Sequence, residues 1–393
     1  MQLYVIAGET SGDQLGGALL EALRMHLPTL KVAGIGGFQL MRQGMPSLFP
    51  MHELSLMGFV EILPHIFRLK RRIRETVADI EARKPDVLLT IDSPGFTMRV
   101  IKQLRARQVH LPRFVHYVAP SVWAYKPERA KEIAPLLDAL LVLLPFEPAY
   151  FERVGLTTHF VGHPAAWWWK NKGFRHKFRE QHGISDAVPV VALFPGSRHN
   201  ELMRHLPLFR ASMLRLKQQH PLVHNVMLIG EALADDAAPA LADWPCPLTL
   251  VFQPDAKRDL FAAADAAITK SGTISLEAFL AGVPSVTVYK ANPLTAMYVK
   301  RLLKTPFVHL ANILARRMLV PELLQKAATP EAVAHHIDTL LSSKEAREAQ
   351  LLGLEAIRAD LGAYETQSPS ERAAQCLLAH FPHAERSVVS AAS

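Results

Sequence analysis

The stretch LYVIAGETSGDQLGGALLEALR, residues 3–24, contains an apolar run, a polar turn and a helical pattern in succession. The apolar run Leu3–Ala7 has the composition of a buried strand, and leucines then recur at helical spacing: Leu15, Leu19, Leu20 and Leu23. A buried strand followed by an amphipathic helix is the repeating unit of a parallel α/β sheet. The polar turn would lie at the carboxyl end of the strand, which is where such sheets bind ligands.

The same alternation continues along the chain and forms two halves. In the first half we expect strands at Leu3–Ala7, Val32–Ile35, Val87–Ile91, Phe114–Val118, Ala139–Leu144 and His159–Val161. In the second half we expect strands at Val190–Phe194, Asn225–Ile229, Leu248–Phe252, Ala266–Thr269 and Ser285–Val288. Only helices are expected later, at Pro330–Leu341 and Lys344–His380. These patterns predict an α/β fold with two doubly wound Rossmann-like domains, 1–165 and 166–340, followed by C-terminal helices and a frayed tail over 341–393.

Composition and charge narrow the class of protein. Of 393 residues, 49% are hydrophobic and 20% are charged, which is usual for a folded protein. No apolar run reaches the roughly 18 residues of a membrane span, and no export signal is recognised. The two cysteines, Cys246 and Cys376, lack metal-ligand spacing. We therefore expect a cytoplasmic protein whose net charge of +8 favours anionic partners.

The polar turn at residues 8–13 is the first candidate site. Backbone N–H groups at the start of a helix attract anions and oxygen-rich ligands, so the acceptor or cleft candidates here are Glu9, Ser11, Gly12 and Asp13. The spacing G-x-x-S-G does not fit a nucleophile elbow, and the chain has no Walker A sequence. The alternative is that Ser11 or Asp13 is an ordinary helix N-cap. The glycines that follow the next strand, Gly34, Gly36 and Gly37, form a second candidate loop on the sugar side.

Asp92 directly follows the wholly apolar strand expected at Val87–Ile91. A carboxylate at the end of a buried strand is partly desolvated, which suits a general base that takes a proton from a hydroxyl group. The alternative is an N-cap or a structural turn aspartate, and the residues alone leave both open.

Two turns in the second half carry groups suited to phosphate. Gly196, Ser197 and Arg198 follow one expected strand, and Ser271, Gly272 and Thr273 follow another and open a helix that carries Glu277. Glycine lets the backbone approach a phosphate, arginine grips paired oxygens, and a carboxylate accepts hydrogen bonds from ribose hydroxyls. Because both turns belong to one half, they predict a diphosphate nucleotide site. The alternative is that Ser271 and Thr273 only cap the helix while Glu277 faces solvent.

The segment LMGFVEILPHIFRLKRRIR, residues 56–74, combines large apolar side chains with five cations. Such a segment suits an anionic membrane or an acyl chain better than nucleic acid, which calls for stacking aromatics among the cations. The expected membrane-facing or acyl-facing residues are Met57, Phe59, Ile66, Phe67, Arg68, Arg71 and Arg72. The alternative is a buried helix with a solvated basic edge. No cofactor is expected, and the spacing of His159 and His163 does not predict a metal site because Gly162 and Pro164 interrupt any helix there.

Several motifs occur in the order known from one family: AGETSGDQLGG, GIGGFQLMRQG, LMGFVEILPHI, KPDVLLTIDSPGF, HYVAPSVWAYKPERAKEI, LLPFEPAYFE, FVGHP, LFPGSRHNEL, SGTISLEAFLAGVPSVTVYK and VPELLQ. With them the chain resembles the lipid-A-disaccharide synthases, bacterial glycosyltransferases of the GT-B architecture, from Leu3 to about Pro330. It departs from the usual family pattern at Gly95, Thr97, Ala119 and Trp167.

The resemblance implies two Rossmann-like domains facing across a cleft, with the acceptor in the first and the nucleotide in the second. It implies that UDP-2,3-diacylglucosamine donates its sugar to the 6-hydroxyl of lipid X, in an inverting reaction without a metal, giving a β-1,6-linked lipid A disaccharide 1-phosphate and UDP. The expected location is peripheral, on the cytoplasmic face of the inner membrane. The resemblance also adds Ser121 to the acceptor side and Asn312 to the nucleotide side, and some family members form a homodimer with exchanged C-terminal helices.

The residues leave two other classes of function open. A GT-B sugar-nucleotide epimerase would share the second-half turns but would need no lipid-facing segment. A non-enzymatic lipid-binding protein would use that segment but would not need a nucleotide site.

Overall fold

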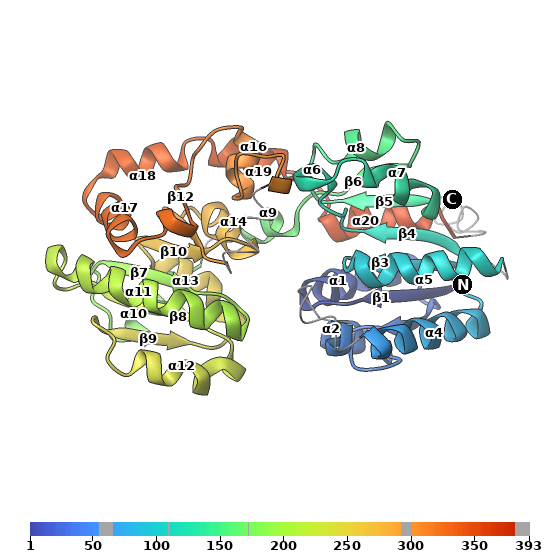
Figure 1. Cartoon of the computed structure of the whole chain (residues 1–393), viewed down its shortest axis with the longest axis horizontal. Helices are drawn as coiled ribbons and strands as arrows, with labels where there is room; N and C mark the ends of the chain where they lie inside the picture. The colour runs from blue at the N-terminus through green and yellow to red at the C-terminus, as the bar shows by residue number, and fades with distance from the viewer. Residues whose placement is uncertain (55–65, 109–110, 172, 292–300, 382–393) are drawn as a thin grey trace. The chain divides into compact units, whose positions relative to one another are not determined.

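The structure is a computed structural model that describes residues 1–54, 66–108, 111–171, 173–291 and 301–381. It divides the chain into two compact units: unit 1 is Met1–Pro164 with Tyr364–Ser393, and unit 2 is Ala165–Ala363. Each unit holds a six-stranded parallel sheet with helices on its faces (Figure 1). The expected α/β fold with two doubly wound sheets is confirmed.

Unit 1 has the strand order β2-β1-β3-β4-β5-β6. Its strands are β1 (Gln2–Ala7), β2 (Lys31–Ile35), β3 (Val87–Ile91), β4 (Arg113–Tyr117), β5 (Ala139–Val142) and β6 (Thr158–Phe160). Its helices are α1 (Thr10–His26), α2 (Phe38–Arg42), α4 (Ile66–Arg83), α5 (Pro94–Arg107), α6 (Val122–Tyr125), α7 (Arg129–Ile133), α8 (Pro148–Glu152) and α20 (Pro369–Leu378). The short helix α9 (Pro164–Trp168) spans the boundary between the units.

Both faces of the unit 1 sheet are buried, which explains why its strands read as nearly continuous apolar runs. Tyr4 and Ile6 of β1 join a core with α4, α5, α7 and α8. Leu3 and Val5 join the opposite core, which α1 and α20 close. Successive side chains of a strand point to opposite faces, so every residue of β1 between Leu3 and Ala7 is buried.

Unit 2 has the strand order β12-β11-β10-β7-β8-β9. Its strands are β7 (Val190–Phe194), β8 (His224–Leu228), β9 (Leu248–Val251), β10 (Ala266–Lys270), β11 (Ser285–Tyr289) and β12 (Glu322–Leu324). Its helices are α10 (Arg175–Gln181), α11 (His199–Gln219), α12 (Ala234–Leu241), α13 (Lys257–Ala263), α14 (Thr273–Leu280), α16 (Leu310–Ala315), α17 (Pro330–Ser342), α18 (Lys344–Leu351) and α19 (Leu354–Asp360). Helices α11, α12 and α17 share one core with the sheet, and on the opposite face Phe194 of β7 packs against Phe261 of α13 at 5.0 Å between ring centroids.

The C-terminal region differs from expectation. The single helix predicted over Lys344–His380 is wrong, because left-handed glycines, Gly353 (φ 98°) and Gly362 (φ 80°), separate α18, α19 and α20. The predicted third region, 341–393, is divided between the units, since α18 and α19 belong to unit 2 and α20 packs against α1. The three-residue strand β12 was not predicted, because so short a run has no periodicity to detect.

Candidate active site

The turns that follow β1 and β3 meet at the carboxyl end of the unit 1 sheet. From β1 the chain passes to β2 on one side of it, and later returns to form β3 on its other side. The strand order therefore reverses between β1 and β3. In open α/β sheets, ligands bind at the carboxyl ends of the strands where the order reverses. A Cβ atom added to Gly8 would lie 2.4 Å from Oγ of Ser93. Glycine at position 8 therefore allows the predicted turn at residues 8–13 to contact the turn that carries Asp92.

The backbone around Asp92 is strained. Asp92 (φ 52°) and Ser93 (φ 47°) are both left-handed, and so is Val118 (φ 76°) after the neighbouring strand β4. The Asp92 N–H donates to the carbonyl of Tyr117 at 2.9 Å, which places the strained residues side by side. A β-branched residue such as Val118 rarely adopts this conformation, and strain of this kind gathers at functional sites. Sequence patterns missed Val118 because its residue type predicts only an extended backbone.

The Asp92 carboxylate is partly buried. Burial raises its pKa above the ordinary value, and the hydrogen bond from the Ser93 N–H to Oδ1, at 2.7 Å, opposes that rise. Among the described residues, no further donor bonds its Oδ2 atom. The N-cap alternative is wrong, since Ser93 is the N-cap of α5 and makes no side-chain capping hydrogen bond. A carboxylate with a raised pKa and an available oxygen fits the expected general base.

Asp13 has a structural role in place of the expected acceptor contact. Its carboxylate is buried and accepts hydrogen bonds from three backbone N–H groups at the start of α2, those of Gly37, Gln39 and Leu40, at 2.8, 2.8 and 3.1 Å. A Cβ on Gly37 would lie 2.8 Å from the same carboxylate, so the glycine cluster expected on the sugar side serves this close packing. Sequence periodicity could not pair a residue of α1 with a loop more than twenty positions later.

The other predicted residues of this turn lie at the start of α1. Glu9 is its N-cap by backbone geometry, without a side-chain capping bond, so neither Ser11 nor Asp13 is the N-cap. Ser11 is exposed, and Gly12 is buried against Ile91 at the end of β3.

The remaining residue expected on the acceptor side, Ser121, is exposed at the start of α6, four residues beyond β4.

Glu147 is a buried carboxylate that residue patterns did not single out. It accepts hydrogen bonds from the indole N–H of Trp123 at 3.1 Å and from the Leu144 N–H at 3.0 Å. Burial raises its pKa to about 7, against the opposing effect of these donors. Through Trp123 it holds α6, which begins beside the predicted residue Ser121. Its position after the apolar end of β5 was the signal available in the sequence.

The two turns predicted to bind phosphate meet at the carboxyl end of the unit 2 sheet, where the strand order again reverses, between β10 and β7. Gly196 (φ 134°) and Gly272 (φ 153°) both have backbone angles that L-residues rarely adopt. Gly272 is the N-cap of α14, so the alternative in which Ser271 or Thr273 caps that helix is wrong. Ser197 lies in the first turn, directly before Arg198.

A carboxylate not predicted from the sequence joins the two turns. Oε1 of Glu201, in the first turn of α11, lies 2.7 Å from Nζ of Lys270 and 3.7 Å from Nη1 of Arg198. Lys270 ends β10, directly before the second phosphate turn, and Arg198 belongs to the first. The structure thus brings two cations, Arg198 of the first turn and Lys270 directly before the second, to a single oxygen atom.

Glu277 is buried on α14, so the alternative that it faces solvent is wrong. It forms an ion pair with Lys257 at the start of α13. Lys257 was not predicted, because nothing in the sequence pairs residues twenty positions apart.

Asn312 was expected on the nucleotide side, but its side chain is not available to a nucleotide. It is fully buried, and its amide donates to the Val320 carbonyl at 2.8 Å and to Glu322 at 2.7 Å. Its oxygen accepts from the N–H groups of Leu319 and Val320 at 2.8 and 2.9 Å. All the hydrogen bonds that the side chain can make are therefore used within unit 2.

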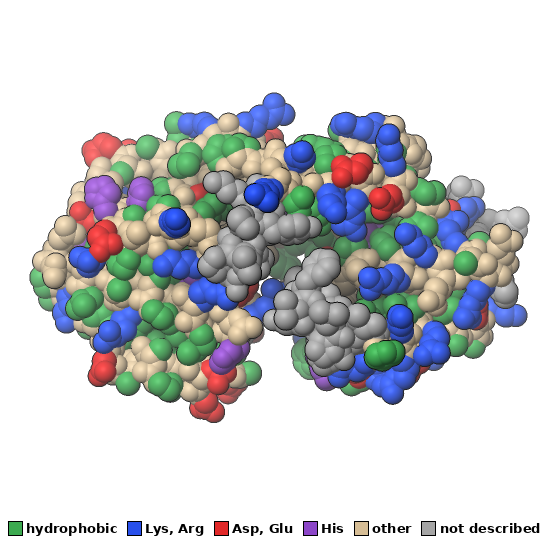
Figure 2. Space-filling model, in the orientation of Figure 1, with side chains coloured by type: hydrophobic (Ala, Val, Ile, Leu, Met, Phe, Trp, Pro, Cys, Tyr) green, Lys and Arg blue, Asp and Glu red, His purple; other side chains and the backbone are tan. Residues whose placement is uncertain are grey.

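Helix α4 has a buried apolar side and an exposed basic side. Ile73, Val77 and Ile80 face the core, while Phe67, Arg68, Lys70, Arg71 and Arg74 are exposed. Figure 2 shows Lys and Arg side chains gathered over the part of unit 1 that contains α4 and α5. The apolar side of this helix is therefore buried, as the alternative expects, while its basic side and Phe67 stay exposed. Ile66 begins α4, and Met57 and Phe59 lie outside the described residues.

Arg72 is wrongly predicted as a membrane-facing residue. It pairs with Glu53, bonds Glu75 at 2.7 Å, and stacks over the Phe49 ring at 4.4 Å. These contacts hold α4 against the segment before it.

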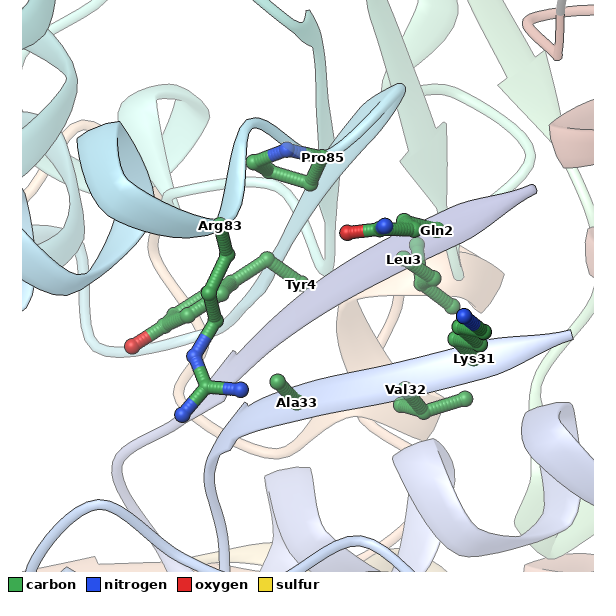
Figure 3. Close-up of a pocket in the computed structure, with 8 residues that line it drawn as sticks. All are labelled: Gln2, Leu3, Tyr4, Lys31, Val32, Ala33, Arg83 and Pro85. Atoms are coloured by element: carbon green, nitrogen blue, oxygen red, sulfur yellow. The ribbon is translucent and has the colours of Figure 1, made fainter.

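Two cavities in unit 1 lie at the opposite, amino end of its sheet. The first, of about 310 Å³, is lined by residues such as Tyr4, Lys31 and Arg83 beside the starts of β1 and β2 (Figure 3). The second, of about 550 Å³, includes Asp86, just before β3, and Arg113, the first residue of β4. Neither touches the carboxyl-end turns. In the described parts of the chain, no helix has the length and apolar composition to cross a bilayer, and no group of three or more His, Cys, Asp or Glu side chains is placed to hold a metal ion.

Comparisons with known proteins give one consistent family. The family described as Lipid-A-disaccharide synthetase matches residues 3–376. A relative from Granulibacter bethesdensis, named Lipid-A-disaccharide synthase, is 42% identical over 367 residues, covering 92% of this chain and 93% of the relative. A relative of the same name from Rhodospirillum centenum is 42% identical over 378 residues, covering 96% of this chain and 94% of the relative.

Solved structures share the fold at low identity. The UDP-GlcNAc 2-epimerase from Neisseria meningitidis, bound to UDP-GlcNAc, has a TM-score of 0.64 at 13% identity and covers 96% of this chain and 100% of its own. The calicheamicin glycosyltransferase CalG4 has a TM-score of 0.59 at 19% identity, with coverages of 96% and 97%. These likenesses support the GT-B fold, which glycosyltransferases and epimerases share.

Proposed function

This chain belongs to the lipid-A-disaccharide synthase family, and from that membership we propose which of its residues carry the reaction. The enzyme transfers the sugar of UDP-2,3-diacylglucosamine to the 6-hydroxyl of lipid X, giving the β-1,6-linked lipid A disaccharide 1-phosphate and UDP. The observation that best supports the donor site is the convergence of the two glycine turns of unit 2 on Glu201. The acceptor hydroxyl is assigned to the strained turns of unit 1.

The donor nucleotide binds at the carboxyl end of the unit 2 sheet. Gly196 and Gly272 allow the backbone to approach the diphosphate, and Arg198 contributes a charge-assisted hydrogen bond. Glu277 accepts hydrogen bonds from ribose hydroxyls. As the sugar departs, UDP gains negative charge, and each charge-assisted hydrogen bond stabilises it by roughly 1.5–3 kcal/mol.

Asp92 acts as the general base. It removes the proton of the acceptor hydroxyl as the oxygen attacks the anomeric carbon on the face opposite UDP, which inverts the configuration. The desolvation that raises its pKa makes the carboxylate a stronger proton acceptor than an exposed aspartate. Ser121 and Ser11, both exposed at helix starts, are assigned to the acceptor side.

A direct assay tests this function. Purified protein is incubated with UDP-2,3-diacylglucosamine and lipid X, and the disaccharide and UDP are measured. Arg198→Ala and Glu277→Ala should both reduce the protection that UDP gives against thermal unfolding, whereas Arg210→Ala, farther along α11, should not. Conversion of UDP-GlcNAc alone to an epimer, without disaccharide formation, would support the epimerase class instead.

We assign the enzyme to the cytoplasmic face of the inner membrane as a peripheral protein. The exposed basic side of α4, with Phe67 near its start, suits an anionic lipid surface that presents both substrates. A homodimer with exchanged C-terminal helices is part of the same proposal, and α20 is the segment that would exchange, because it follows unit 2 in sequence but packs with α1. The molar mass measured by light scattering tests the dimer.

A further inference from the structure

Lys270 is placed at the proposed donor site without having been assigned a role there. It is the last residue of β10, and its side chain is 17% exposed. A Cβ atom added to Gly272 would lie 3.6 Å from the Lys270 Nζ atom. The ammonium group therefore lies against the turn Ser271–Thr273, where a phosphate would approach the backbone.

Lys270 shares its carboxylate partner with a second cation. Glu201 supplies one carboxylate to two cations, Lys270 and Arg198. The other acidic residue of the proposed site, Glu277, is already paired with Lys257. A diphosphate brings more negative charge than one carboxylate and offers several acceptor oxygens, so it is a better partner for two cations on two adjacent turns.

The turn that carries Glu201 also lies close to the proposed phosphate position. A Cβ atom on Gly196 would lie 2.7 Å from the Glu201 Cβ atom, so this glycine lets the first phosphate turn pack directly against Glu201. The Glu201 carboxylate therefore holds the Lys270 ammonium between the two turns before any ligand arrives.

We propose that Lys270 binds the diphosphate of the donor nucleotide, exchanging Glu201 for phosphate oxygens when the nucleotide enters. This inference rests on the proposed function, whose donor site it completes. A positioned ammonium stabilises the charge that develops on the leaving diphosphate and needs no reorganisation at the moment of bond cleavage. Lys270 thereby joins Arg198 as a source of positive charge at this site.

The test compares a ligand that has the diphosphate with one that lacks it. Affinities for UDP and for uridine are measured by calorimetry on the parent, on Lys270→Gln and on Lys270→Met. Glutamine keeps a donor for Glu201, and methionine keeps much of the apolar stem, so the two variants perturb the fold differently. Each should bind UDP about 10- to 100-fold more weakly, as expected for a lost charge-assisted hydrogen bond, and should bind uridine as the parent does.

Two controls accompany these variants. Lys270→Arg keeps the charge and should retain most of the UDP affinity. Lys217→Met removes a lysine 18 residues beyond the start of α11, about 27 Å along the helix at 1.5 Å per residue, and should leave both affinities unchanged.

The outcomes separate this inference from the proposed function. If the parent binds UDP and makes disaccharide while the two neutral variants bind UDP as tightly as the parent, the role of Lys270 is overturned and the function stands. Equal losses of UDP and uridine affinity would also overturn it, because they indicate a purely structural lysine. A parent that binds no UDP would overturn both.

Discussion

Asp92 combines a strained backbone with a partly desolvated carboxylate. Both features cost folding free energy, and such costs gather at functional sites. In Asp92→Asn the amide keeps an oxygen for the Ser93 N–H but cannot accept a proton. Turnover should fall by roughly 10²–10⁴-fold, the usual contribution of a general base. Turnover with both lipid substrates at saturation measures this effect.

The stability of the same variant separates a base from a structural aspartate. Burial raises the folded-state pKa of Asp92, so the carboxylate form is disfavoured by folding at neutral pH, and its removal should not lower the melting temperature. UDP affinity should match that of the parent. A variant that melts earlier yet keeps its turnover once folded would make Asp92 a turn residue and require a different base.

Glu147 gives a pH-dependent signature. Its pKa in the folded protein is about 7, above its ordinary value of 4.5, so the folded state holds a proton that the unfolded chain has released. Its contribution to stability is therefore fully present below pH 4.5 and is lost as the pH rises through 7. Glu147→Gln lacks this titration, so its melting temperature should rise relative to the parent between about pH 5 and pH 8. If the difference in melting temperature between Glu147→Gln and the parent is the same at every pH, the raised pKa of Glu147 is contradicted.

At the scale of elements, helix α4 packs its apolar side into the core of unit 1 and exposes its basic side to solvent. Arg71→Glu combined with Arg74→Glu reverses charge on its exposed side without touching Arg72, which binds Glu53 and Glu75. Binding to vesicles that contain anionic lipid should weaken at least about 10-fold, since each basic residue contributes roughly 1 kcal/mol near such a surface. Cosedimentation with vesicles measures the change.

The control for this prediction carries the same charge change elsewhere. Lys326→Glu combined with Lys344→Glu alters two exposed lysines of unit 2 and should leave vesicle binding largely intact. If both pairs weaken binding equally, net charge rather than the basic side of α4 attracts the membrane. UDP affinity should stay at the parental value in the α4 variant.

At the scale of the whole molecule, the chain returns to unit 1 only at its end. Helix α20 buries Ala373, Ala374 and Leu377 in the core that contains α1. A chain that ends at Ala363 exposes this face, and the loss of Leu377 and Phe381 burial alone removes roughly 3–6 kcal/mol. Calorimetry should show the unit 1 transition lowered by about 5 °C or more.

Unit 2 provides the internal reference for that truncation. Its sheet and its proposed nucleotide turns precede the cut, so UDP should still raise its unfolding temperature. Gln375→Ala, an exposed position on α20, should melt like the parent. An unchanged unit 1 transition in the truncated chain would show that α20 does not stabilise this unit.

The sequence by itself determined the order of strands β1 to β11, the family and the turns that line the two sheet edges. Apolar periodicity and glycine placement act over a few residues, so they can be recognised without knowing the fold. Asp92, Arg198 and the turn at Ser271–Thr273 were predicted for this reason, since each directly follows a buried strand or opens a helix.

Only the tertiary structure decided which polar side chains hold the protein together and which remain available at the site. Asp13 binds the start of α2, Asn312 uses all its hydrogen bonds within unit 2, and Glu201 brings Lys270 to the phosphate turns. The partners Gly37 of Asp13, Val320 of Asn312 and Lys270 of Glu201 lie 24, 8 and 69 positions away in the chain. A carboxylate or amide has the same local signature whether it binds a substrate or a buried N–H group, so its role depends on what folding places beside it.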